Sequence, residues 1–178
     1  MQRELLRTAL FFVYSETTKK NRRAVLHKRK GGGIMIKYQG YETGRFVILS
    51  LKRGDLLLET IEKELAKSGI RNAVISSAIG SLQKVVLHRV IGTGREPEDE
   101  FVTLEKPMEL ASLQGIVLDG KAHFHMVVSD VENAYTGHLE PGTTVLYLTE
   151  ISLLELKGVS LCREKNEDNI GMIVEKEG

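Results

Sequence analysis

The sequence predicts an α+β domain built from one main helix and a mostly antiparallel sheet or barrel. Two patterns carry this prediction: one segment with helical spacing near the start, and a long series of strand-like runs after it. The chain has 178 residues, which is enough for one domain with a substantial core and too few for two of ordinary size. Its apolar share of 42% and charged share of 28% are ordinary for a globular protein.

The helix is expected to begin just after Gly54, because Asp55 is a residue type that caps helix N-termini well. Apolar residues then recur at helical spacing, namely Leu57, Ile61 and Leu65. Gly69 is placed to end the helix, because glycine readily adopts the left-handed conformation found after many helix C-termini. A β-rich run from Arg45 to Leu51 precedes the helix and predicts the first strand.

The strands after the helix are expected at 73–90, 101–106, 108–118, 121–129 and 143–156. The first of them is expected to break at 78–81, which contains Gly80. Residues 92–100 are polar and contain glycine and proline, so we expect a loop there. The charged tail after Arg163 is expected to be weakly structured, with one last strand near 170–174.

Formal charge is distributed unevenly along the chain. Residues 1–34 carry nine basic and two acidic residues, a charge of +7, whereas residues 35–178 carry 16 basic and 22 acidic residues, a charge of −6. The basic run consists of Lys19, Lys20, Arg22, Arg23, Lys28, Arg29 and Lys30. This run lacks apolar periodicity and ends at three glycines, so we expect residues 1–34 to be a disordered arm ahead of a domain at 35–178.

Three interpretations of the arm stay open. Clustered Lys and Arg side chains neutralise phosphates, so the arm is a candidate contact for nucleic acid. The plainer interpretation is a solvated tail. In the third, the codons for Lys30 and the following glycines are a purine-rich ribosome-binding site, the arm is not translated, and Met35 is the true start.

The sequence favours a cytoplasmic protein without membrane association. No apolar run approaches the ~20 residues that span a bilayer. The apolar stretch from Ala9 to Tyr14 lacks a small-residue cleavage site and continues into a basic segment, which argues against a signal peptide. Cys162 is the single cysteine and cannot form an intramolecular disulfide, so nothing indicates an oxidising compartment.

Three of the five histidines lie within sixteen residues and form the main candidate site. His123 and His125 flank Phe124 in a predicted strand, where residues two apart point to the same face. If the polar stretch 130–137 reverses the chain, His138 returns beside the pair. Three converging imidazoles are a common way to build a zinc site, and a catalytic site keeps a fourth position open for water.

The same histidines have a plainer interpretation, either as an exposed polar face or as a hydrogen-bonded pair under a loop. His88 is interpreted as an ordinary strand histidine. The candidate acids are Asp130, Glu140 and Glu150. Glu150 interrupts an apolar strand, where an unpaired buried carboxylate would be unfavourable. Its carboxylate is expected to accept a hydrogen bond from a ligand histidine, to pair with an arginine, or to face outward.

A series of landmarks runs through residues 44–156. In order they are RFVILSLKRGD at 45–55, SAIGSL at 77–82, MELASLQG at 108–115, HFHMVVS at 123–129, GHL at 137–139 and LTEI at 148–151. In this order and spacing the chain resembles the plants and prokaryotes conserved (PPC) domain family, in its stand-alone prokaryotic form. The resemblance implies a compact α+β domain that assembles as a homotrimer.

The resemblance also bears on the site. In plants the PPC domain accompanies AT-hook segments that bind DNA, and no Arg-Gly-Arg-Pro hook occurs in this chain. The histidine pattern is similar to the zinc site of α-acetolactate decarboxylase, which has a related fold. That similarity implies His123, His125 and His138 as ligands of zinc or another divalent transition metal. It stops at the ligands, because the decarboxylase's other catalytic residues find no match here.

Three functions follow as hypotheses. The first is a trimeric metal protein that binds or transforms a small anionic substrate, using a metal-bound water or a polarised carbonyl. The second is a DNA-binding protein of the AT-hook-associated PPC type. The charge of −6 over residues 35–178 argues against this, because duplex DNA requires a positive face. The third is a trimer that recruits partners without catalysis.

Overall fold

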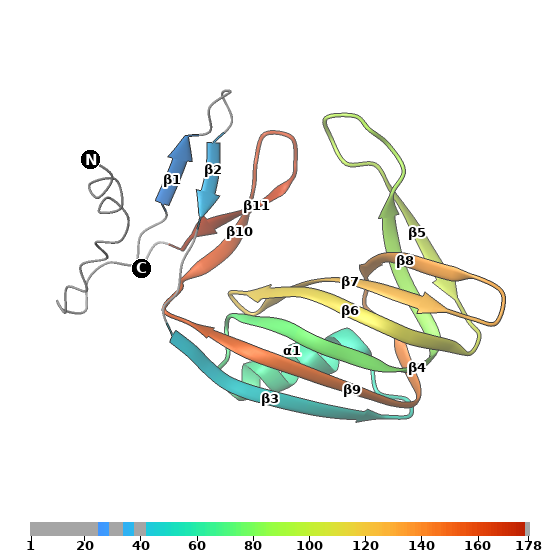
Figure 1. The fold of residues 1–178 in the computed structure, drawn as a ribbon. Coiled ribbons are helices and arrows are strands. Elements are labelled where there is room, and N and C mark those ends of the chain that lie inside the picture. Colours follow the sequence, from blue (N-terminus) through green and yellow to red (C-terminus); the bar gives the residue numbers. More distant parts are fainter. Residues whose placement is uncertain (1–24, 29–33, 38–41, 177–178) are drawn as a thin grey trace, which may run out of the picture.

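The computed structural model describes residues 25–28, 34–37 and 42–176, and its elements are labelled in Figure 1. Within these residues one helix, α1 (Leu57–Lys67), stands among eleven strands. The main sheet contains β3 (Glu42–Lys52), β4 (Ala73–Val90), β5 (Asp99–Leu104), β6 (Met108–Leu118), β7 (Lys121–Ser129), β8 (Ala134–Leu139) and β9 (Thr144–Lys157). Two hairpins complete the description: β1 (Val25–Lys28) with β2 (Ile34–Lys37), and β10 (Leu161–Lys165) with β11 (Gly171–Glu175). The predicted α+β class is confirmed.

The main sheet has the order β3-β9-β4-β6-β7-β8, with β5 paired to β4, and all its pairings are antiparallel. The long strand β4 pairs with β9 and β6 along its first half and with β5 and β8 near its end. Because β8 pairs with both β7 and β4, the strands β4, β6, β7 and β8 form a ring. The sheet is not a closed barrel, since β3 stays at one edge.

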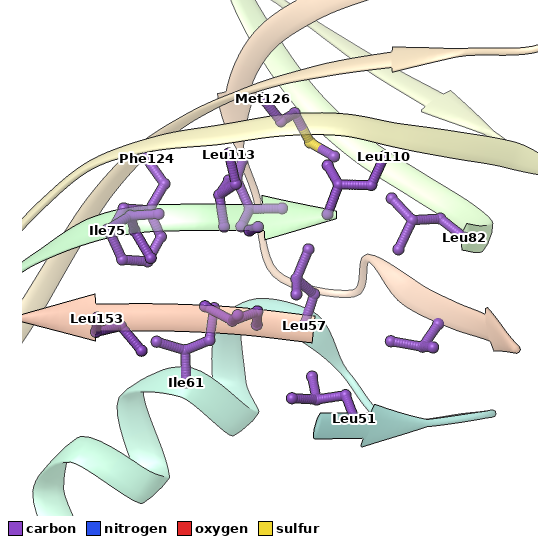
Figure 2. Packing of buried hydrophobic residues seen from close by; sticks show 14 of the residues in the cluster. Leu51, Leu57, Ile61, Ile75, Leu82, Leu110, Leu113, Phe124, Met126 and Leu153 are labelled. Carbon is purple, nitrogen blue, oxygen red and sulfur yellow. The ribbon is translucent and has the colours of Figure 1, made fainter. Parts of the chain in front are cut away.

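The core lies between α1 and the inner face of the sheet. Leu57, Ile61 and Leu65 are buried on the helix, which confirms the predicted helical stripe. Figure 2 shows the first two in one cluster with residues of the sheet such as Leu113 and Phe124. Burial of such side chains contributes most of the free energy that holds a small domain together. The outer face of the ring, away from this core, is where the histidines lie.

The two ends of α1 differ in how well the sequence predicted them. The N-cap is Leu56, not Asp55, and no side chain caps the helix there. The Asp55 carboxylate instead accepts a hydrogen bond from the Lys52 backbone N–H at 2.9 Å, which closes the turn before the helix. At the other end Gly69 has a φ of +67° directly after the C-cap Ser68, as predicted.

Three strand predictions need correction. β4 does not break at 78–81 but continues through these residues. Its pairing with β9 shifts register at several β-bulges, which let the strand stay continuous. The polar stretch 130–137 is a turn only at its start: Asp130 caps the Glu132 and Asn133 N–H groups, and β8 begins at Ala134. The tail after Arg163 has its predicted last strand, β11, but it is not weakly structured, because β11 pairs with β10 in a hairpin.

Most of the expected basic arm lies outside the described residues. Of its nine basic residues only Lys28 is among those the structure describes, at the end of β1. The stretches 25–28 and 34–37 pair as antiparallel strands, so residues 25–28 and 34 of the expected arm have regular backbone structure.

Candidate metal centre

Four histidines meet on the outer face of three neighbouring strands. His88 on β4 is the direct cross-strand partner of His138 on β8, and His138 is in turn the partner of His125 on β7. His123 lies two residues before His125 and therefore on the same face of β7. The predicted return of His138 to the His-x-His pair is confirmed.

Distances within the cluster are short. The Nε2 atoms of His123 and His125 are 3.3 Å apart. The ring of His138 is edge-on to both, with centroids 4.9 Å from His123 and 5.5 Å from His125. On its other side His138 stacks on His88, with a centroid distance of 4.5 Å. His138 is thus the centre of the cluster.

Two glycines let the strands carrying these histidines approach closely. A Cβ on Gly137 would lie 2.5 Å from the backbone oxygen of His88, so only glycine lets β8 fit against β4 here. A Cβ on Gly115 of β6, where φ is +137°, would lie 2.0 Å from the backbone oxygen of His123. The backbone around the cluster is therefore specified by residues that carry no functional group themselves.

Glu140 is the carboxylate of the cluster. Its Oε1 accepts a hydrogen bond from His88 Nδ1 at 2.6 Å and lies 3.3 Å from His138 Nδ1. The second contact does not have hydrogen-bond geometry, and His138 Nδ1 is buried without a hydrogen-bond partner among the described residues. Phe101 of β5 packs against His88, with ring centroids 5.3 Å apart, and covers this side of the cluster.

Burial and nearby charges lower the pKa of two histidines of the cluster, His123 and His138. Burial, the charge of Arg163 and the neighbouring histidines together lower the pKa of His123 to about 4. Burial and the charge of His88 also lower the pKa of His138, although Glu140 works in the opposite direction. A neutral imidazole carries a free lone pair, which is the state that binds a metal ion.

The other predicted acids lie elsewhere. Asp130 pairs with Lys106, and this contact, with backbone N–H groups, lowers the pKa of Asp130 to about 2. Glu150 is exposed on β9 in register with Ser50 and Ile79, so the structure does not bring it to the histidines. Glu140, which the sequence offered only as one of three acids, holds the position beside them.

His88, interpreted from the sequence as an ordinary strand histidine, lies inside the cluster. Together His88, His138 and Glu140 place one possible ligand atom each within 4.8 Å of the others. This grouping depends on the pairing of β4 with β8, whose residues are about fifty positions apart in the sequence. The one local sequence feature that indicated this pairing was the Gly-His pair at 137–138, because a glycine inside a strand often marks a close approach of another backbone.

The fold and the cluster together define a class of protein, a ring-like α+β domain with histidines and one carboxylate gathered on the outer face of its sheet. Residues 38–157 match the family model of the Plants and Prokaryotes Conserved domain, abbreviated PCC or PPC. The chain belongs to this family, as its sequence landmarks predicted. No curated protein sequence matches the chain closely enough to count as a relative.

The solved structures that are similar to the chain include the following three. A metal-containing protein from Archaeoglobus fulgidus is 30% identical, with 79% of this chain and 99% of that one covered and a TM-score of 0.66. A plant- and prokaryote-conserved protein from Pyrococcus horikoshii is 26% identical, with coverages of 80% and 99% and a TM-score of 0.67. A hypothetical protein from Salmonella cholerae-suis is 25% identical, with coverages of 78% and 100% and a TM-score of 0.65.

Membrane insertion through helices finds no support in the described part of the chain. Its helix α1 spans 11 residues, and no helix there is long and apolar enough to cross a bilayer.

Proposed function

We propose that this PPC-domain protein binds one zinc-like divalent ion per chain through His123, His125 and His138. The observation that carries the proposal is the 3.3 Å separation of the His123 and His125 Nε2 atoms, with the His138 ring edge-on to both. Two nitrogens bound to one tetrahedral zinc ion at ~2.0–2.1 Å are about 3.3–3.4 Å apart. The two rings are therefore already spaced as a ligand pair.

The donor set also fits a metal by its chemistry. Imidazole nitrogens suit zinc, nickel, copper and iron, and the lowered pKa values of His123 and His138 keep both rings unprotonated near pH 7. If the metal is bound at Nε2 of His138, its buried Nδ1 carries the proton and faces Glu140 Oε1 at 3.3 Å. A metal-containing relative from Archaeoglobus fulgidus agrees with the proposal.

Glu140 and His88 support the ligands in this proposal. A carboxylate behind a ligand histidine fixes the orientation of the ring and raises its basicity. Glu140 is 3.3 Å from His138 Nδ1 and is itself held by His88 at 2.6 Å. The alternative ligand set is His88, His138 and Glu140, whose donor atoms also converge. Both ligand sets include His138, so they are distinguished by variants of the other two residues of each set.

The test is elemental analysis of the purified full chain and three double variants. We expect about one metal ion per chain in the wild type and none after His123→Ala with His125→Ala. The control changes exposed Lys121 and Val127 of the same strand to alanine and should keep the metal. Full occupancy in the histidine variant would refute the proposed ligands. If only His88→Ala with Glu140→Ala empties the site, the alternative set is correct.

The proposed activity is binding or transformation of a small anionic substrate. A bound divalent ion would supply Lewis acidity and an activated water. The chain's own contribution would be orientation of the rings by Glu140 and a partly buried setting that strengthens electrostatic contacts. DNA binding is the weaker candidate, because residues 35–178 carry a charge of −6.

We also propose a homotrimer. The family resemblance motivates this, and the outer face of β3 and β4 exposes apolar side chains that a partner copy would cover: Phe46 at 60%, Ile48 at 71% and Ile79 at 52%. Sedimentation equilibrium of the full chain should give three times its mass of 19.9 kDa. Ile48→Asp should lower the measured mass below that of the trimer, because the substitution would bury a charge in the contact between copies. A wild-type monomer at micromolar concentration would contradict the proposal.

A further inference from the structure

The main sheet has an opening between β4 and β6. Cross-strand pairing of these strands stops at Val74 with Ile116 and resumes only at Gly80 with Leu110. Between these points lies a cavity of about 350 Å³, lined by residues 74–79 of β4 and 111–116 of β6, which we call the slot. Neighbouring strands ordinarily stay ~4.8 Å apart and hydrogen-bonded, so an opening inside a sheet requires a structural cause.

A bulge lies on each strand beside the slot. β4 shifts register against β9 at 75–77, and β6 shifts register against β7 at 110–112. A bulge bends the strand that carries it, and bulges are frequent next to active sites. Both strands are therefore bent at the level where their mutual pairing is interrupted.

Two glycines at the ends of the slot add to the separation. A Cβ on Gly80 would lie 2.4 Å from the backbone oxygen of Leu148 on β9. A Cβ on Gly115 would lie 2.0 Å from the backbone oxygen of His123 on β7. The missing side chains let β4 lie close to β9 and β6 close to β7, which draws β4 and β6 apart.

The slot has an apolar floor and a polar, uncharged rim. Ile75 and Leu113 of the floor are 8% and 1% exposed, and Figure 2 shows both in the buried cluster. The rim carries the hydroxyls of Ser77 and Ser112 and the carboxamide of Gln114. None of these three side chains forms a hydrogen bond with another described residue. No charged residue lines the slot, so its chemistry suits a neutral group that both donates and accepts hydrogen bonds.

One end of the slot adjoins the candidate metal centre. Gln114 is the direct cross-strand partner of His125, and Ile116 is that of His123. Side chains that are directly opposite in an antiparallel pair share a face, with Cβ atoms ~4.5–5.5 Å apart. Gln114 therefore stands between the slot and the histidines. Ile79, which belongs to the proposed contact between copies, lies at the other end of the slot.

We propose that the slot binds the uncharged amide portion of a small N-acylated amino acid or dipeptide, whose anionic end reaches the metal centre. The inference names a substrate class for the proposed function and rests on that function for the anionic end. Two facing strand edges offer N–H and C=O groups with which an extended amide can pair. A charged group in the slot would lose water without gaining a partner. The volume is near the lower limit for small-molecule sites, which restricts the ligand to a short one.

The test compares two hydroxamates by calorimetric titration of the metal-loaded full chain. N-acetyl-alanyl-alanine hydroxamate carries the amide portion and an end that binds metal as an anion, whereas acetohydroxamate carries only the metal-binding end. Ser112→Val and Gln114→Leu remove hydrogen-bonding groups of the slot with little change in side-chain size. Gln83→Leu on β4 is the matched control, because it makes the same substitution outside the slot.

We expect the wild type to bind the longer hydroxamate about 10-fold or more tightly than acetohydroxamate, and each slot variant to reduce this ratio about 3- to 10-fold, as for loss of one hydrogen bond. Affinity for acetohydroxamate itself should not change, and Gln83→Leu should keep the wild-type ratio. Alanyl-alanine hydroxamate has a free ammonium group in place of the acetyl amide. It should bind less tightly than the acetylated form, because no carboxylate lines the slot.

Three outcomes would overturn the inference: equal affinities of the wild type for the two hydroxamates, an unchanged ratio in both slot variants, or an equal fall of the ratio in Gln83→Leu. The metal proposal fails separately, through absence of metal from the wild-type chain. In that case the neutral probe N-acetyl-alanyl-alaninamide should still shift the NMR signals of residues 111–116 in the wild-type chain, and should shift them less in Gln114→Leu. Absence of these shifts would refute the slot as a binding site.

Discussion

The two faces of β7 show two different ways in which a sequence specifies a structure. Inner residues Phe124 and Met126 are each 1% exposed and belong to the core. Outer residues His123 and His125 alternate with them and face the candidate metal centre. The inner pair is defined by burial alone, so any residue of similar size and polarity serves. The outer pair is defined by its partners on other strands, which is a far narrower requirement.

The comparison teaches that stability and function are separable along this single strand. Inward substitutions should act on the free energy of unfolding, and outward substitutions on metal binding. Three changes break or sharpen this division, and they are ordered here by the size of the expected effect.

Phe124→Ala should have the largest effect. It removes a fully buried ring from the core and should lower the free energy of unfolding by about 3–5 kcal/mol. Urea denaturation of the metal-free protein measures this. Val127→Ala, on the exposed face of the same strand, should change it by less than about 0.5 kcal/mol. A similar decrease in the free energy of unfolding in both variants would mean that the outer face of β7 also stabilises the domain.

Glu140→Gln should act on metal affinity while leaving the fold intact. Removing the charge behind His138 should weaken the bound ion about 10- to 100-fold, as for other carboxylates that orient a ligand histidine. Competition with a chelator of known affinity measures the change. Glu132→Gln in the exposed turn before β8 is the matched control. Complete loss of metal, in place of weaker binding, would indicate that Glu140 is itself a ligand.

The smallest effect concerns pH and the metal-free protein. His123 has an ordinary pKa of 6.5 when unfolded and about 4 when folded, so the folded state binds fewer protons between these values. Titration of His123 should not change the free energy of unfolding above about pH 6.5. It should lower this free energy as the pH falls from 6.5 toward 4, and cause no further change below that. His123→Gln should flatten this part of the stability–pH curve. Identical slopes for variant and wild type would show that the ring is not protected from protonation.

Much of the fold could be predicted because the hydrophobic pattern sets it. β6 and β7 have the predicted bounds, and Leu57, Ile61 and Leu65 form the buried stripe of α1. Of the strands after residue 42, two were missed for physical reasons. The residues of β8 are mostly small or polar, so it shows little apolar alternation, and β10 is too short and charged to be distinguished from a tail.

The candidate site was predictable only in part. His123 and His125 share a face by simple alternation, and the turn at 130–133 returns His138 to them. His88 and Glu140 join the cluster through the pairing of β4 with β8, which no local pattern determines.

Gly137 has a consequence for how variation in this chain would be interpreted. Any side chain at this position would collide with the backbone of His88 and push β8 away from β4. The displaced strand would carry His138 and Glu140 with it, and the site would lose its centre without the change of a single donor atom. In a saturation mutagenesis experiment selected on metal content, position 137 would therefore be as intolerant as the histidine next to it. Its side-chain volume, not its chemistry, would be the quantity under selection.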